Sequence, residues 1–492
     1  MTQRIMAIDQ GTSSSRAIVF DLDGRVLGVG QEPFDMIFPQ SGWVEQDPEV
    51  LWRTTLAAGR AALEAAGVEA GHVAAIGITN QRETTLVWDR ATGECVHNAI
   101  VWQDRRTAAR CQAMVADGLE DQVVRETGLV IDPYFSATKL AWLLDEVPGL
   151  RARAERGELC FGTVDAFLIW RLTGGRVHAT DATNAGRTQL FDIGRQRWSS
   201  ELLEYFRIPE SLLPEVRDSA DDFGVASAEW FGAEIPIRGV AGDQHAAMVG
   251  QGCLEPGMSK STYGTGCFAL TNTGTRQLGS RHRLLTTLAY RIGGTPTYAL
   301  EGSIFSAGVA VKWLRDRLGL IDVAADTEAA ARRTGGDTGG VYLVPAFTGL
   351  GAPHWKPDAR GTIVGLSLDS SRDQLVTATL CSVAYQTEEL LGCMAADGAP
   401  VKRLRVDGGM VVNDWLCQFL ADVLDCPVER PRITETTALG AAMLAAVGAG
   451  LVPDLAHTAR LWHLEREFAP AMEERQRREL VAGWRQAVAR AL

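Results

Sequence analysis

The sequence predicts an α/β protein of two domains. A chain of 492 residues is too long for one compact core. Strand-like apolar runs alternate along it with segments of helical spacing. A pattern of strand, glycine-containing turn and strand recurs in the second half. We therefore expect two related halves, residues 1–250 and 251–492, that face one another across a cleft, with the boundary at the glycine cluster of residues 250–257.

The first element is a β-hairpin, and its tip is polar. Residues 5–20 read IMAIDQGTSSSRAIVF, in which the apolar runs 5–8 and 17–20 flank the turn. Glycine lets backbone approach an anion, turn amides and hydroxyls donate to phosphate oxygens, and Asp9 at the strand end can hold a cation. The same residues would also suit an ordinary solvated tip, so the hairpin alone leaves both readings open.

The rest of the first half continues in the order strand, helix, strand. The turn at residues 21–24 leads into a third strand at 25–30, which completes a meander. Helical spacing follows at 48–66, with Asp47 as N-cap and Pro48 in the first position. A buried strand at 74–79 then carries residues 80–83 at its carboxyl end, which is where open α/β sheets bind ligands.

The second half repeats this plan loosely. Residues 259–272 read as strand, glycine turn and strand, with the turn at 264–266. Apolar residues at three- and four-residue spacing predict a long helix over 376–394. A strand at 404–407 leads into the turn Gly408-Gly409 and a further helix at 413–424. This repetition predicts a second meander with its own Gly/Thr tip.

Composition limits the partners and the compartment. A formal net charge of −13 argues against nucleic-acid binding, since no basic surplus exists to neutralise a phosphate backbone. We expect no signal peptide, because Asp9 and Gln10 interrupt the first apolar run, and no membrane span, because no apolar stretch is long enough. The nine cysteines form no C-x-x-C pair, which is typical of buried thiols in a reducing cytoplasm.

Several common catalytic motifs are missing. No G-x-x-x-x-G-K-[ST] is present, and no G-x-G-x-x-G opens a helix after a strand. The sequence also lacks a G-x-S-x-G elbow and the H-E-x-x-H pattern of zinc enzymes. A P-loop enzyme, a serine hydrolase and a zinc enzyme are therefore disfavoured.

Nine motifs in the same order carry a resemblance to a known family. The chain resembles the FGGY family of carbohydrate kinases, and within it the kinases that act on glycerol, from the first strand to the last helix. The motifs are AIDQGTSSSRA, GITNQRETT, IVWQDRRT, TGLVIDPYFSATK, AGDQHAAMVGQ, TYGTGCF, VPAFTGLGAPHW, RVDGGMVVND and TALGAAMLAA.

The resemblance implies an actin-like ATPase fold of two ribonuclease-H-like domains. ATP, Mg²⁺ and glycerol would meet in the cleft between them, and the product would be sn-glycerol 3-phosphate. It further implies a cytoplasmic enzyme of glycerol catabolism that forms a homo-oligomer, either a dimer or a tetramer. Composition and periodicity alone lead only to a two-domain α/β protein with phosphate-binding turns.

Asp243 is the candidate general base. Phosphoryl transfer to an alcohol needs a base for the hydroxyl proton, and Asp243 follows the strand-like run 235–241 between a glycine and a glutamine. The resemblance assigns the base to this residue. The alternative is an N-cap for a helix that starts at His245, and capping would not exclude catalysis.

The candidate polyol site begins with Arg82 and Glu83. These neighbours could be a surface ion pair of little energetic value, but a guanidinium beside a carboxylate also suits hydroxyls that both donate and accept. The aromatic members of the set could equally be core residues, or apolar walls against the carbon chain of the polyol. The resemblance adds to the glycerol site Trp102, Tyr134, Asp243, Gln244 and Phe268.

The nucleotide site follows from the two glycine-containing turns. By resemblance, Asp9 and Asp243 lie near the metal, and the turn Gly408-Gly409 serves the adenosine, although it could be a plain tight turn. The first phosphate loop would contain Gly11, Thr12, Ser13, Ser14 and Arg16. The second would contain Gly264, Thr265 and Gly266, and the adenosine pocket Gly308, Lys312, Gly408, Gly409, Met410 and Asn413.

Two other functions remain open from the sequence. The first is an FGGY kinase for another substrate, such as xylulose, gluconate or erythritol, and residues 80–83 are the segment that would distinguish it. The second is an actin-like protein or chaperone ATPase without a small-molecule acceptor. Polyol-independent ATP turnover would favour this second function.

Overall fold

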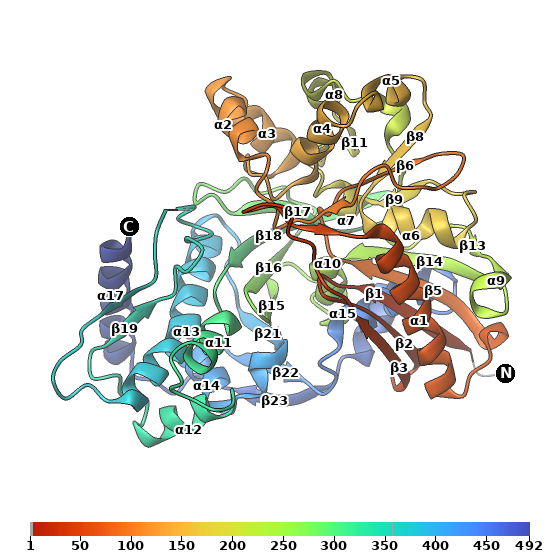
Figure 1. Ribbon diagram of the computed structural model, residues 1–492. Helices are drawn as coiled ribbons and strands as arrows, with labels where there is room; N and C mark the ends of the chain where they lie inside the picture. The colour runs from red at the N-terminus through yellow and green to blue at the C-terminus, as the bar shows by residue number, and fades with distance from the viewer. Residues whose placement is uncertain (1–2, 357) are drawn as a thin grey trace.

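The computed structural model describes residues 3–356 and 358–492, and in these ranges two large mixed sheets are covered by helices (Figure 1). The predicted α/β class is therefore confirmed. Within these ranges no helix is long and apolar enough to cross a membrane. All nine cysteines are free thiols, and seven of them are buried.

The first sheet has six strands in the order β13-β14-β5-β1-β2-β3. Antiparallel pairing of β1 with β2 and of β2 with β3 confirms the predicted meander. On its other side β1 pairs in parallel with β5, and β5 with β14, so three carboxyl ends share one edge. The strands are β1 (Arg4–Gln10), β2 (Ser14–Asp21), β3 (Val26–Pro33), β5 (Val73–Asn80), β13 (Val225–Ala226) and β14 (Ile235–Gly242).

The second sheet has seven strands in the order β17-β18-β16-β15-β21-β22-β23. The predicted hairpin of β15 and β16 is present, but the next strand in the chain, β17, lies at the sheet edge, and β18 pairs with β16 instead. The expected simple meander is therefore wrong in this half. The strands are β15 (Met258–Tyr263), β16 (Cys267–Gly274), β17 (Leu285–Ile292), β18 (Thr295–Ile304), β21 (Arg403–Asp407), β22 (Val428–Pro431) and β23 (Leu464–Phe468).

Helix α1 (Pro48–Ala66) covers the meander, and its bounds are those predicted. Asp47 accepts a hydrogen bond from the backbone N–H of Glu49, Pro48 needs no donor in the first turn, and Gly67 ends the helix with φ = 62°. Local chemistry therefore fixes both ends of this helix.

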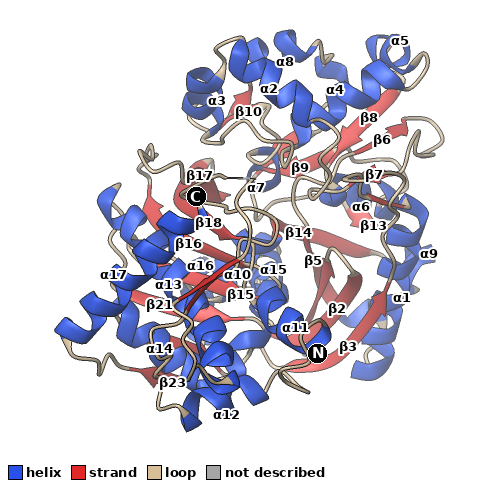
Figure 2. Ribbon diagram, turned by 60° about the vertical axis from the view of Figure 1, so that its left-hand side comes forward, coloured by secondary structure: helices blue, strands red, loops and turns tan. Residues whose placement is uncertain are grey.

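Helices α10 (Asp243–Gly250) and α15 (Thr436–Gly448) join the two halves (Figure 2). A Cβ on Gly440 would lie 1.8 Å from the carbonyl oxygen of Ala246, so only glycine allows this close packing. Helix α15 also packs on β1, β5 and β14 of the first sheet. Because the second half of the chain covers part of the first sheet, the boundary between residues 250 and 251 stays a prediction.

The two helices predicted in the second half are confirmed. Helix α13 (Arg372–Ala396) starts with a capping box at Ser371, and α14 (Asp414–Leu424) has Asn413 as its N-cap. The other helices are α2 (Ala108–Ala116), α3 (Glu120–Thr127), α4 (Ser136–Glu146), α5 (Leu150–Glu155), α6 (Val164–Leu172), α7 (Ala182–Ala185), α8 (Ser200–Phe206), α9 (Ala228–Phe231), α11 (Gly308–Asp316), α12 (Asp326–Arg333), α16 (Leu455–Thr458) and α17 (Glu474–Ala491).

A small cap of helices lies beyond the first sheet. Helices α2, α3, α4, α5 and α8 gather at the top of both views (Figures 1 and 2). The short strands that complete the described chain are β4 (Glu45–Gln46), β6 (Leu86–Asp89), β7 (Ala99–Ile100), β8 (Leu159–Gly162), β9 (Ala179–Asp181), β10 (Phe191–Asp192), β11 (Arg197–Trp198), β12 (Glu215–Arg217), β19 (Tyr342–Val344) and β20 (Thr362–Val364).

Candidate active site

Strand register brings the candidate site together at one edge of the first sheet. Gln10 at the end of β1 is opposite Asn80 at the end of β5, and Asn80 is opposite Gly242 at the end of β14. The residues that follow these three strands therefore emerge side by side. They are the first hairpin tip, the segment 81–83, and Asp243.

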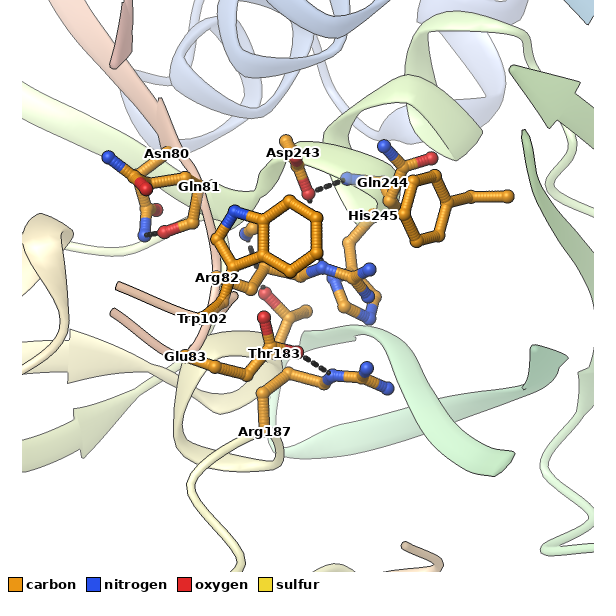
Figure 3. A network of polar contacts seen from close by, with 12 residues as sticks. Asn80, Gln81, Arg82, Glu83, Trp102, Thr183, Arg187, Asp243, Gln244 and His245 are labelled. Carbon is orange, nitrogen blue, oxygen red and sulfur yellow. Dashed lines mark hydrogen bonds and ion pairs between the residues drawn. The ribbon is translucent and has the colours of Figure 1, made fainter. Parts of the chain in front are cut away.

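Asp243 is the first residue of α10. Gly242 holds the N-cap position, so the alternative interpretation of Asp243 as the N-cap is wrong. Its Oδ1 accepts a hydrogen bond from the backbone N–H of Gln244 at 2.7 Å and lies 3.1 Å from Nε of Arg82 (Figure 3). The side chain is 33% exposed, so a ligand can reach this carboxylate.

Arg82 and Glu83 do not form a surface pair with each other. Both side chains are buried, and each has a different partner. Arg82 donates to Glu301 on β18 through Nη1 at 2.6 Å and Nη2 at 3.3 Å. Glu83 accepts from Nε of Arg187 at 2.6 Å (Figure 3), and Arg187 also donates to Glu301 at 3.0 Å. The four side chains form one buried charge network, which we call the Arg82–Glu301 network.

The pKa values of the two carboxyl groups in this network are shifted in opposite directions. Burial raises the pKa of Glu301, but the guanidinium groups of Arg187 and Arg82 outweigh burial and hold that pKa at about 2. For Glu83, burial prevails over the same two guanidinium groups, and the pKa is raised. Glu83 also has φ = 61°, an unfavourable backbone conformation for a side chain of this size. Strain of this kind at a charged residue is typical of functional sites.

Three aromatic side chains lie around Arg82. The ring of Phe268 has its centroid 5.9 Å from the guanidinium carbon, and the hydroxyl of Tyr134 lies 3.5 Å from Nη2. Trp102 packs edge-on against Tyr134 at 5.5 Å and donates through Nε1 to Oγ1 of Thr12 at 3.0 Å. All three aromatic residues are half-buried, whereas the alternative interpretation as core residues would require full burial.

The tip of the first hairpin closes on itself and leaves polar groups near the surface. The N–H of Gly11 donates to the carbonyl of Ser14 at 2.9 Å, and Ser13 between them is exposed. Arg16 lies on β2 opposite Asp9 and forms an ion pair with Glu435, the N-cap residue of α15. This hairpin therefore contacts both halves of the chain.

Asp9 lies near two other carboxylates and one guanidinium group. Burial raises its pKa to about 7, the charges of Asp243 and Glu435 add to this effect, and Arg16 opposes it. A divalent cation would relieve this repulsion. No cluster of three or more histidine, cysteine or acidic side chains suited to a metal occurs among the described residues. Two carboxylates that share a cation with phosphate oxygens suit Mg²⁺.

A cavity of about 420 Å³ lies in the second half beside the second hairpin tip. Gly308 approaches the backbone so closely that a Cβ there would lie 2.5 Å from the carbonyl oxygen of Gly264, and a Cβ on Gly408, at φ = 93°, would lie 2.5 Å from that of Tyr263. The Gly408 turn is thus tight and borders the cavity as well. The predicted nucleotide residues that line it are Gly264, Thr265, Gly308, Lys312, Gly409, Met410 and Asn413.

Comparison with known proteins gives the family. The sequence model described as "FGGY family of carbohydrate kinases, N-terminal domain" matches residues 4–250, and that of the C-terminal domain matches residues 260–449. The chain belongs to the FGGY family of carbohydrate kinases. Its predicted two-domain, actin-like fold and its enzymatic class are therefore confirmed.

Relatives in the FGGY family match along nearly the whole chain. Glycerol kinase from Rhodospirillum centenum is 61% identical over 486 residues, which cover 99% of this chain and 97% of that protein. Glycerol kinase 1 from Pseudomonas aeruginosa is 59% identical over 490 residues, with 100% and 99% covered.

Solved structures of other kinases match the fold. The crystal structure of Plasmodium falciparum glycerol kinase with ADP superposes with a TM-score of 0.94 at 34% identity, covering 100% of this chain and 98% of that one. Gluconate kinase from Lactobacillus acidophilus has a TM-score of 0.89 at 20% identity, with 99% of each chain covered, and supports the fold alone.

Sequence reasoning about this FGGY kinase missed the inner partners of the site. Arg187 and Glu301 were not identified, although a glutamate within the apolar run of β18 was a usable signal. Lys260, a fully buried lysine on β15, was missed in the same way. The cavity also has lining residues outside the nine motifs, namely Val311, Arg315, Ala324, Ala325, Thr327, Glu328 and Leu380.

Proposed function

We propose that this FGGY kinase transfers the γ-phosphoryl group of ATP to glycerol and makes sn-glycerol 3-phosphate. The observation that carries the proposal is the 56–61% identity, over nearly the full chain, to relatives named glycerol kinase. The xylulose and gluconate kinases among the structural neighbours are at most 24% identical, so they do not favour another substrate.

Asp243 is the proposed general base. Its carboxylate takes the proton of the reacting hydroxyl as the oxygen bonds to the γ-phosphorus, and ADP leaves with the electrons of the broken P–O bond. Its position supports this role, because Asp243 is partly exposed at the sheet edge and fixed by Arg82 at 3.1 Å. A carboxylate held by a guanidinium is oriented before substrate binds.

The Arg82–Glu301 network is the proposed polyol clamp. Arg82 can only donate and Glu83 can only accept, so together they match a hydroxyl that does both. Trp102, Tyr134 and Phe268 would contact the carbon chain. Their contacts with one another and with Arg82 support a small, shaped site.

The nucleotide is proposed to extend from the 420 Å³ cavity to the two hairpin tips. The cavity would take the adenosine, and the backbone amides of residues 11–14 and 264–266 would face the phosphates. Asp9 and Asp243 would hold Mg²⁺, as the raised pKa of Asp9 supports. When bound, the ion neutralises charge that develops on the β- and γ-phosphate oxygens.

Other properties stay predictions. We propose a cytoplasmic enzyme of glycerol catabolism that forms a homo-oligomer, as the family resemblance implies. Size-exclusion chromatography with light scattering measures the oligomeric state directly. A monomer at working concentration would contradict the prediction.

A substrate panel tests the proposed function. The purified protein is given ATP, Mg²⁺ and one of about a dozen acceptors, including glycerol, erythritol, xylulose and gluconate, and ADP is measured by a coupled assay. We expect glycerol to have the highest kcat/KM. Preference for a sugar would favour another FGGY activity, and equal ADP formation without any acceptor would favour a plain ATPase.

A further inference from the structure

Lys260 is a buried cation that joins the two halves of the candidate site. It lies on β15 in the second half, and its side chain is fully buried. Its Nζ donates to Oε1 of Gln244, which is the second residue of α10 in the first half. It also donates to Oγ1 of Thr262 at 3.0 Å and to the carbonyl oxygen of Phe268 at 3.4 Å. The three partners use all three N–H donors of an ammonium group.

This arrangement fixes the orientation of the Gln244 amide. The oxygen and the nitrogen of a glutamine amide have nearly the same shape, so the neighbours decide which faces where. An ammonium group has no acceptor, so only Oε1 of Gln244 can face Lys260. The Nε2 group then remains for a ligand, and Gln244 can present hydrogen-bond donors alone.

The donor character of Gln244 decides where a substrate proton points. Gln244 follows Asp243 directly, and the two lie side by side in Figure 3. A hydroxyl oxygen that accepts from Nε2 of Gln244 keeps its own hydrogen free for a carboxylate. Both oxygens of Glu301 already accept from guanidinium groups, so the carboxylates proposed to receive this hydrogen are those of Asp243 and Glu83.

We propose that Lys260 is a positioning and specificity residue, which holds Gln244 as an obligate donor and so selects substrates with a hydroxyl oxygen at that place. The proposal rests on the proposed function and adds a residue to it. It also explains why a lysine is buried at this point of β15. Lys260 donates to Gln244 on α10, to Thr262 on β15 and to a backbone carbonyl on β16. Its position therefore depends on both halves of the chain.

A double-mutant cycle tests the proposal. Lys260→Met removes the charge at similar length, and Gln244→Ala removes the amide. We expect each single variant to raise the Kd for glycerol, measured by calorimetry, and its KM by about tenfold. The double variant should be no weaker than Gln244→Ala within about twofold, since Lys260 acts through Gln244. If the double variant instead raised the Kd for glycerol about a hundredfold, the two effects would be independent, and the proposal would be overturned.

Controls separate this proposal from a folding defect and from the proposed function. Lys402→Met makes the same change at an exposed lysine outside the site, and we expect the KM for glycerol to change less than about twofold. Gln244→Glu keeps Lys260 and its contact but turns a ligand-facing donor into an acceptor, so it should weaken glycerol binding at least as much as Gln244→Ala. Wild-type affinity in Gln244→Glu would overturn the orientation argument. If the wild-type protein neither binds nor phosphorylates glycerol, the proposed function fails, and this inference with it.

Discussion

Glu301→Gln tests whether the Arg82–Glu301 network is the buried charge centre of the site. The change keeps shape and volume but removes the carboxylate that accepts from both Arg82 and Arg187. A carboxyl group with a pKa of about 2 instead of 4.5 prefers its ionised form by about 3 kcal/mol. Removing one partner of a buried ion pair costs about 3–5 kcal/mol. Arg82 keeps Asp243 and Arg187 keeps Glu83, so we expect the lower figure.

The assay is chemical unfolding of wild type and variant, followed by tryptophan fluorescence. We expect Glu301→Gln to lower the free energy of unfolding by about 3 kcal/mol at pH 7. Glu474→Gln, which breaks an exposed pair with Arg478, should cost less than about 1 kcal/mol. Equal losses in the two variants would refute the reasoning.

The pH dependence gives a second check on Glu301. Because the folded pKa is below the ordinary value, the stabilisation is complete above pH 4.5 and is lost as the pH falls towards 2. The difference in stability between wild type and Glu301→Gln should therefore shrink over that interval. A difference that stays constant with pH would contradict an ionised Glu301.

Further predictions concern the substrate, the nucleotide and the cleft. Arg82→Ala should lower kcat/KM for glycerol by about 5- to 150-fold, equivalent to about 1–3 kcal/mol, and leave the KM for ATP nearly unchanged; equal losses for both substrates would indicate a folding defect instead. Gly308→Ala should raise the KM for ATP but not for glycerol, because the new Cβ would lie 2.5 Å from the carbonyl oxygen of Gly264, and kinetics with each substrate varied in turn will show this. The two halves should close when glycerol and a nonhydrolysable ATP analogue bind, since water must be excluded; an unchanged radius of gyration in small-angle scattering would count against closure.

Local signals predicted much of this fold, and long-range pairing limited the rest. The start of α1 was predicted because Asp47 and Pro48 act within a few residues, and its end was predicted from the extent of the helical spacing. The order of β16, β17 and β18 was predicted wrongly as a simple meander, since the order depends on which strand reaches β16 after a long loop. No local pattern reports that choice.

The candidate site shows the same limit. The segment 80–83 and Asp243 were predicted to lie at strand ends, and parallel register brings them together. Arg82 and Glu301 lie 219 residues apart in the chain, so their pairing left no signal of spacing. The adjacent charges of Arg82 and Glu83 suggested an ion pair between these two residues. In the structure Arg82 pairs with Glu301 instead, and Glu83 pairs with Arg187.

Phosphoryl transfer by wild type and by Asp243→Asn is the most direct test of the central claim. ADP is measured by a coupled assay, and sn-glycerol 3-phosphate by a dehydrogenase that oxidises only this enantiomer. Asp222→Asn, at an exposed aspartate paired with Arg238, is the matched control. We expect wild type and control to form one sn-glycerol 3-phosphate per ADP, and Asp243→Asn to lower kcat by about 10²- to 10⁴-fold. Near-normal turnover in Asp243→Asn, or ADP without glycerol phosphate in wild type, would contradict the account.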